Sequence, residues 1–321
     1  MRKHTLKISY VGVAAAVLLG TVGIAPANAS NSFDPIESIL NAAPEVLKDS
    51  ITSASVDLNR DVVSRTSVST GASVELSAQA SAGVTLKSSD GTSISIGLPS
   101  TDKKPVAKKV RNQVAYDNRD GSTTVPVTKS DGSVQITTVL ADASAPLRYE
   151  YALGLPEGTR LNLDSSGSVS ILNNEGVFVG GVLPAWAKDA NGESVATNYE
   201  VSENKLVQVV TLSGNEVFPV VADPWLGIGL IDKVVKTTDA GKGARYLVYP
   251  TVWGRGGAGI AARWAAWGEA AEKGVPRTAT LENQFLCHYD ARPVTTFKSS
   301  WNLEAYTADK GYFGFVGNMC N

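Results

Sequence analysis

The chain contains few of the residue types that most often carry chemistry. Its 321 residues include two cysteines, two histidines and two methionines. His4 lies in the first few residues, so His288 is the one histidine expected in a folded domain. Protein zinc sites combine several imidazole or thiolate ligands, and one histidine cannot build such a site without several carboxylates. We therefore predict no metal and no other cofactor.

Long apolar runs and an excess of positive charge are also absent. A membrane-spanning helix needs about 20 apolar residues, and no segment reaches that length. The formal net charge is −2, and a mildly acidic protein has no general attraction to nucleic acid or to an anionic membrane. The one basic cluster, at residues 103–111, is interrupted by Pro105 and is typical of a solvated linker. We expect neither nucleic acid nor membrane as a partner.

The first 29 residues have the pattern of a secretory signal peptide. A basic head at residues 2–7 precedes an apolar run from Val11 to about Ile24, and Ala27-Asn28-Ala29 matches an A-x-A cleavage site. The apolar run is too short for a membrane anchor. We therefore predict cleavage near Ala29–Ser30 and a secreted, extracellular mature protein.

The two cysteines are predicted to form one disulfide. An even number of cysteines in an exported chain is typical of a disulfide framework. A bond between Cys287 and Cys320 would close a loop of about 33 residues and stabilise the fold by about 3–4 kcal/mol. The alternative is a catalytic thiol at Cys287, activated by the adjacent His288. Neighbours in sequence seldom face each other in the required geometry, which favours the disulfide.

Residues 30–82 are predicted to hold two short helices and then a stretch rich in serine and threonine. Asp34-Pro35 is a typical helix start, because the aspartate caps the first backbone N–H groups and proline suits the first helical position. Pro44 should end this helix and open a second one.

Residues 83–224 are predicted to form a β-rich module. Strand-like runs, of which 93–96, 134–137 and 206–210 are examples, are separated by turn pairs that end in glycine. Glycine supplies the positive φ that tight hairpins need, and this regular alternation favours an antiparallel sandwich or an open barrel. The module holds no histidine or cysteine, and its acidic residues lie mostly in turns. We expect a scaffold here, not a site.

The remaining chain is predicted to hold a short helix at 226–235, a linker that completes the segment 225–245, and a C-terminal domain at 246–321. That domain should have one helix from about 258 to 273, a second through His288, and a strand or hairpin from 295 to 316. Trp264 and Trp267 repeat at helical spacing, a stripe more typical of a core than of a ligand platform. The predicted fold class is α+β, mainly β: an antiparallel β-sandwich-like module followed by a small disulfide-closed α+β domain.

Two stretches resemble known secreted proteins. The motifs Asn283-Gln284-Phe285-Leu286-Cys287-His288 and Lys298-Ser299-Ser300-Trp301-Asn302-Leu303-Glu304, with the terminal Cys320-Asn321, resemble an uncharacterised secreted actinobacterial family, the domain of unknown function 2599. Residues 217–225 resemble the closing strand of β-rich modules in secreted actinobacterial proteins. The chain departs from the family at Asn283, where an acidic residue is usual, and at 305–307. The resemblance implies secretion and a small disulfide-closed domain, and it implies no known activity.

The residues that could form a site gather in this C-terminal domain. His288 has a side-chain pKa suited to proton transfer, and Glu304 and Arg255 could act with it, so these three are the catalytic candidates. Trp301 could stack on a sugar or a peptide. The binding candidates are Trp301, Asn302, Glu304 and Arg263. The alternative for His288 is a structural role, in which its ring bonds a backbone carbonyl beside the disulfide.

Three functions fit these observations. The leading hypothesis is a secreted, non-catalytic protein whose β scaffold displays a C-terminal recognition domain for a cell-envelope glycan or another secreted protein. The second is a secreted hydrolase or toxin-like effector that uses His288 and Glu304 as an acid–base pair. The third is a structural protein of the cell envelope. A cleft that holds His288, Glu304 and an arginine would favour chemistry, whereas a His288 buried against the disulfide would favour a structural role.

Overall fold

Two short helices begin the part of the chain that the computed structural model describes. That part comprises residues 33–51, 56–68, 71–88, 91–99, 104–256, 259–291 and 298–321, without the side chains at 256 and 259–261, and the predicted signal peptide lies outside it. The helices are α1 (Pro35–Ala42) and the 3-10 helix η1 (Pro44–Leu47). The carboxylate of Asp34 accepts the backbone N–H groups of Ile36 and Glu37, so it caps α1 as predicted.

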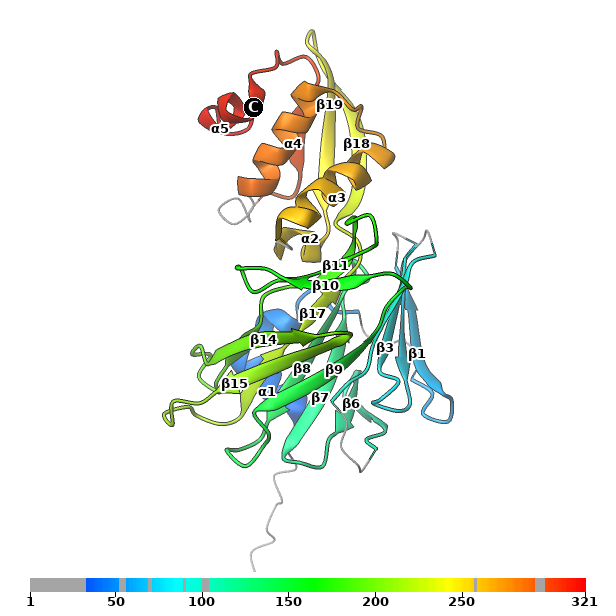
Figure 1. Cartoon of the computed structure of the whole chain (residues 1–321), viewed down its shortest axis with the longest axis vertical. Coiled ribbons are helices and arrows are strands. Elements are labelled where there is room, and N and C mark those ends of the chain that lie inside the picture. The colour runs from blue at the N-terminus through cyan, green and yellow to red at the C-terminus, as the bar shows by residue number, and fades with distance from the viewer. Residues whose placement is uncertain are drawn as a thin grey trace, which may run out of the picture. The chain divides into compact units, whose positions relative to one another are not determined.

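Two antiparallel sheets follow and form the predicted β module (Figure 1). The strands of the first are β1 (Val62–Ser67), β2 (Ser73–Ser77), β3 (Val84–Lys87), β4 (Ser93–Ile96), β9 (Arg148–Gly154), β14 (Ala196–Ser202) and β15 (Lys205–Thr211). The strands of the second are β5 (Ala107–Val110), β6 (Gln113–Asp117), β7 (Ser122–Thr128), β8 (Val134–Leu140), β10 (Arg160–Leu163), β11 (Val169–Leu172), β12 (Phe178–Val182), β13 (Trp186–Lys188), β16 (Val220–Asp223) and β17 (Trp225–Gly227). Their orders are β1-β2-β3-β4-β9-β15-β14 and β10-β11-β12-β17-β8-β7-β6-β5, with β16 joining β13 to β8.

The main hydrophobic core lies between these two sheets. It joins Leu76, Leu86 and Tyr151 of the first sheet to Tyr116 and Ile136 of the second, and all five side chains are buried. A core enclosed between two antiparallel sheets is a sandwich, so the predicted fold class is confirmed. The module begins earlier than expected, at β1, because the serine- and threonine-rich stretch already pairs as strands.

Helix α1 covers the outer face of the second sheet. Ile39 of α1 and Val46 of the following η1 pack there against Val125 and Val127 of β7 and Val139 of β8. Strands β7 and β8 are therefore buried on both faces. In β8 apolar side chains lie on both sides, with Val139 toward α1 and Ile136 in the main core.

The C-terminal part is a three-stranded antiparallel sheet with helices packed on it (Figure 1). Its strands lie in the order β18 (Ile231–Asp239), β19 (Gly243–Pro250) and β20 (Trp301–Glu304). Its helices are α2 (Val252–Gly256), α3 (Gly259–Glu272), α4 (Ala279–Ala291) and α5 (Gly311–Gly317). Helices α3 and α4 confirm the two helices predicted for this region. The predicted Cys287–Cys320 disulfide is also confirmed, with the two Cα atoms 5.4 Å apart.

The helix predicted at 226–235 is wrong, because that stretch contains the end of β17 and the first half of β18. Val234 and Val235 pair with Val248 and Leu247 of β19. Pairing with β19 gives this stretch partners for its backbone hydrogen bonds, and its β-branched residues favour a strand. These two effects outweigh the helix-like spacing of a few apolar residues. The predicted linker is accordingly the end of β18 and its hairpin turn. For the strand or hairpin predicted at 295–316, the described part holds the strand β20, and the helix α5 follows it where a hairpin was the alternative.

The sandwich and the C-terminal sheet share apolar contacts. Phe178 of β12 stacks on Trp253 of α2 with ring centroids 5.9 Å apart, and Asp131 accepts the backbone N–H of Trp253 at 2.9 Å. Residues Asp34–Asn321 form one compact unit. The predicted boundary at 225–245 therefore crosses a region where the two parts pack together.

Candidate functional site

Two side chains of α4 bond the free edge of strand β20. The side-chain amide of Gln284 makes two hydrogen bonds with the backbone of Glu304. Its Oε1 accepts the Glu304 N–H at 2.8 Å, and its Nε2 donates to the Glu304 carbonyl oxygen at 3.1 Å. One helical turn later, His288 Nε2 lies 3.1 Å from the carbonyl oxygen of Asn302. An exposed strand edge can pair with other chains, so these two residues close an edge that would otherwise be open.

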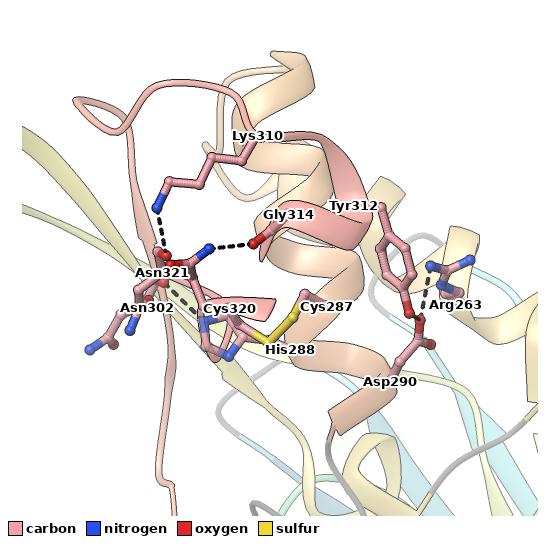
Figure 2. The surroundings of a disulfide bond; sticks show 11 residues. Arg263, Cys287, His288, Asp290, Asn302, Lys310, Tyr312, Gly314, Cys320 and Asn321 are labelled. Atoms are coloured by element: carbon pink, nitrogen blue, oxygen red, sulfur yellow. Dashed lines mark hydrogen bonds and ion pairs between the residues drawn. A yellow bond between two sulfur atoms is a disulfide. The ribbon is translucent and has the colours of Figure 1, made fainter. Parts of the chain in front are cut away.

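His288 is held neutral by its surroundings. Its side chain is 1% exposed, and burial is the main cause that lowers its pKa to about 4, helped by the charge of Lys298 and opposed by hydrogen bonds to Asn302 and Asn321. A carbonyl oxygen can only accept, so Nε2 carries the proton of the neutral ring. Figure 2 shows the ring between Asn302 and the C-terminal Asn321. At neutral pH this histidine serves as a hydrogen-bonded part of the fold.

The disulfide fixes the C-terminal end against α4, next to His288 (Figure 2). Cys287 and Cys320 are both buried and pack with Phe315 of α5. Lys310 donates to the backbone carbonyl of Asn321 at 3.2 Å. Because Cys287 is bonded to Cys320, it is not a free thiol, and the alternative of a catalytic cysteine does not hold in this structure.

Trp301 belongs to the core and not to the surface. Its side chain is 1% exposed. The ring makes edge contacts with Phe285 and Tyr289 of α4, with centroids 5.4 and 5.9 Å away. The indole that was expected to stack on a ligand thus joins β20 to α4.

Asn302 and Glu304 point to the opposite face of β20. Side chains alternate along a strand, and the burial pattern shows Trp301 and Leu303 buried with Asn302 and Glu304 half-buried. The Glu304 carboxylate accepts the Thr307 hydroxyl at 3.0 Å. Since Trp301 faces α4, the structure does not bring the carboxylate of Glu304 together with the ring of His288.

The two predicted arginines make structural contacts. Arg255 donates to the backbone carbonyls at 298–299, where the chain leads into β20. Arg263 forms an ion pair of 2.9 Å with Asp290 at the end of α4, and the Tyr312 hydroxyl donates to the same carboxylate at 2.7 Å (Figure 2). Both guanidinium groups are thus held by groups other than the His288 ring and the Glu304 carboxylate.

Two polar residues with central positions were missed by sequence reasoning. Gln284 could have been found from its spacing, because residues four apart on a helix share a face, and it lies four before His288. Glu269 of α3 gives no such signal. Its carboxylate accepts the backbone N–H groups of Leu230 and Ile231 at 2.9–3.2 Å, and burial raises its pKa to about 7.

A cleft of about 820 Å³ lies beside Glu269. Trp264 and Glu272 of α3 also line it, and Phe178 and Ile228 contribute apolar surface. In the described part of the chain no group of three or more histidine, cysteine or carboxylate side chains is placed to hold a metal ion. The cleft itself offers an aromatic ring, Trp264, and the carboxylates of Glu269 and Glu272.

Among the comparisons with known proteins, one family model matches the C-terminal part of the chain. No curated protein and no solved structure matches the chain significantly. Residues 232–321, which begin in β18 and run to the C-terminus, match the family model described as Protein of unknown function (DUF2599), as the resemblance of the Cys-His and Trp-Asn-Leu-Glu motifs predicted.

Proposed function

We propose that this chain is an exported binding protein without catalytic activity, in which the β-sandwich carries a C-terminal recognition domain. One observation carries the proposal: His288, the residue best suited to proton transfer, is buried, neutral and bonded to the carbonyl of Asn302. A general base must reach the substrate proton, and a buried ring held by the backbone does not.

Export is supported by the signal-like N-terminal segment and by the Cys287–Cys320 disulfide, since such bonds persist in oxidising compartments. None of the helices in the described ranges has the length and apolar character to cross a membrane. Asn302 and Glu304 remain binding candidates on the sheet face opposite α4, where their register neighbours are Leu247 and Arg245 of β19.

The test uses the mature chain and envelope fragments of the source organism. We expect the protein to sediment with the fragments and to release no soluble products from them. The His288→Gln variant should sediment equally well, because glutamine can still donate to the Asn302 carbonyl. Failure of the wild type to sediment would contradict the proposal. Release of products that stops in the variant would instead support the alternative of a hydrolase.

A further inference from the structure

The cleft beside α3 is bordered by both parts of the compact unit 34–321. Trp264, Glu269 and Glu272 of α3 contribute to its lining, as do Ser88 and Thr92, which flank the β3–β4 turn. Its volume of about 820 Å³ falls within the range of small-ligand sites, about 300–1,000 Å³. A ligand of several rings therefore fits in it.

Trp264 gives this cleft an aromatic surface. Its side chain is 49% exposed, whereas Trp253, Trp267 and Trp301 of the same domain are at most 3% exposed. The two tryptophans that were predicted to form a core stripe on α3 therefore differ. Trp267 lies in the core as predicted, whereas Trp264 faces solvent. A large indole left half-exposed in a concave surface is typical of a binding site.

The polar groups of the cleft favour a ligand rich in hydroxyl groups and without negative charge. Glu269 presents a carboxylate whose orientation is fixed by two backbone N–H groups, those of Leu230 and Ile231. Glu272, exposed on the next turn of α3, adds a second carboxylate. Carboxylates accept hydrogen bonds from hydroxyl donors, and they repel anions.

Lys273 is the one cation that lines the cleft in the described structure. Asp131 also lines it and adds a third carboxylate, which accepts the N–H of Trp253 and of Ser133. The available charge is therefore negative, and an acidic ligand is disfavoured.

We propose that this cleft binds a neutral oligosaccharide, with one sugar ring stacked on Trp264 and sugar hydroxyls donating to Glu269 and Glu272. The assignment rests on the proposed recognition role and names its ligand class. An apolar sugar face against an aromatic ring, with a few oriented polar groups around it, is the combination that the cleft offers.

The experiment titrates the mature chain with cellohexaose, mannohexaose and chitohexaose, and with hexagalacturonate as an acidic counterpart. Binding is followed by intrinsic tryptophan fluorescence and by calorimetry. We expect saturable binding of at least one neutral hexasaccharide and none of hexagalacturonate. Trp264→Ala should weaken binding at least tenfold without lowering Tm, because the ring is half-exposed, and Trp264→Phe should recover part of it.

The matched control is Phe313→Ala, which removes an aromatic ring that is 85% exposed on α5 and does not line the cleft. Its binding should equal that of the wild type. The inference is overturned if none of the three neutral hexasaccharides binds, if Trp264→Ala binds as tightly as the wild type, or if hexalysine competes for the site more strongly than the sugars. Envelope sedimentation separates the two proposals: if Trp264→Ala still sediments like the wild type, the recognition role stands and the cleft is excluded as its site.

Discussion

Acidification should destabilise the wild-type protein more than its His288→Gln variant. The folded-state pKa of His288 is about 4, against about 6.5 for a histidine in the unfolded chain. Between these values the unfolded state binds a proton that the folded state does not, so stability falls as the pH decreases from about 6.5 to about 4. With about 1.4 kcal/mol per pKa unit, the loss approaches about 3 kcal/mol. Most of this loss should have developed at pH 4.5.

Urea unfolding at pH 7.5 and pH 4.5, followed by tryptophan fluorescence, measures this difference. Glutamine can keep a donor to the Asn302 carbonyl but does not titrate, so the variant should lack the loss. Burial raises the pKa of Glu269 to about 7, which acts in the opposite sense, but this contribution is common to both proteins and cancels. Equal losses in the wild type and the variant would refute the reasoning. So would an NMR titration of the His288 ring with a midpoint near 6.5, a measurement that does not depend on the variant.

Three further outcomes follow from the same contacts. Gln284→Ala should lower the free energy of unfolding by about 1–3 kcal/mol, because it leaves backbone groups of β20 unpaired, and chemical denaturation that showed no change would contradict the edge assignment. Replacing both Cys287 and Cys320 by alanine should cost about 2–4 kcal/mol, and thiol labelling of the native wild type should find no free cysteine. Glu304→Gln should change stability by at most about 1 kcal/mol, since the half-buried side chain keeps an acceptor for the Thr307 hydroxyl; a larger loss in Tm measurements would show a structural role that the contacts do not reveal.

Local features of this chain were predictable because their causes are local. The Asp34 cap depends on its own side chain and the next three residues. The run at 93–96, predicted from its alternation, is the strand β4 with the same bounds. The prediction of a helix at 226–235 was wrong, because a short apolar segment is compatible with helix and strand alike. The pairing of β18 with β19 favours the strand.

The candidate site was less predictable, because its contacts join segments that are far apart in the chain. The number of cysteines predicted the disulfide, and the motif around Cys287 and His288 predicted the family model that matches residues 232–321. It did not show that His288 and Gln284 face the edge of β20, or that Glu304 faces away from them. Those facts depend on which face of α4 meets which edge of the sheet, and that docking involves residues far apart in the chain.

By itself the sequence determined the composition of this protein, its signal-like N-terminus, its β-rich middle and the single possible disulfide pair, because each follows from residue type and short-range spacing. Only the tertiary structure decided that His288 is buried and neutral, that Trp301 lies in the core and that Trp264 remains in a cleft. Burial shifts a pKa by removing water from around the charged form, and water is removed by neighbours from distant segments. A residue's chemistry here is therefore a property of its packing as much as of its type.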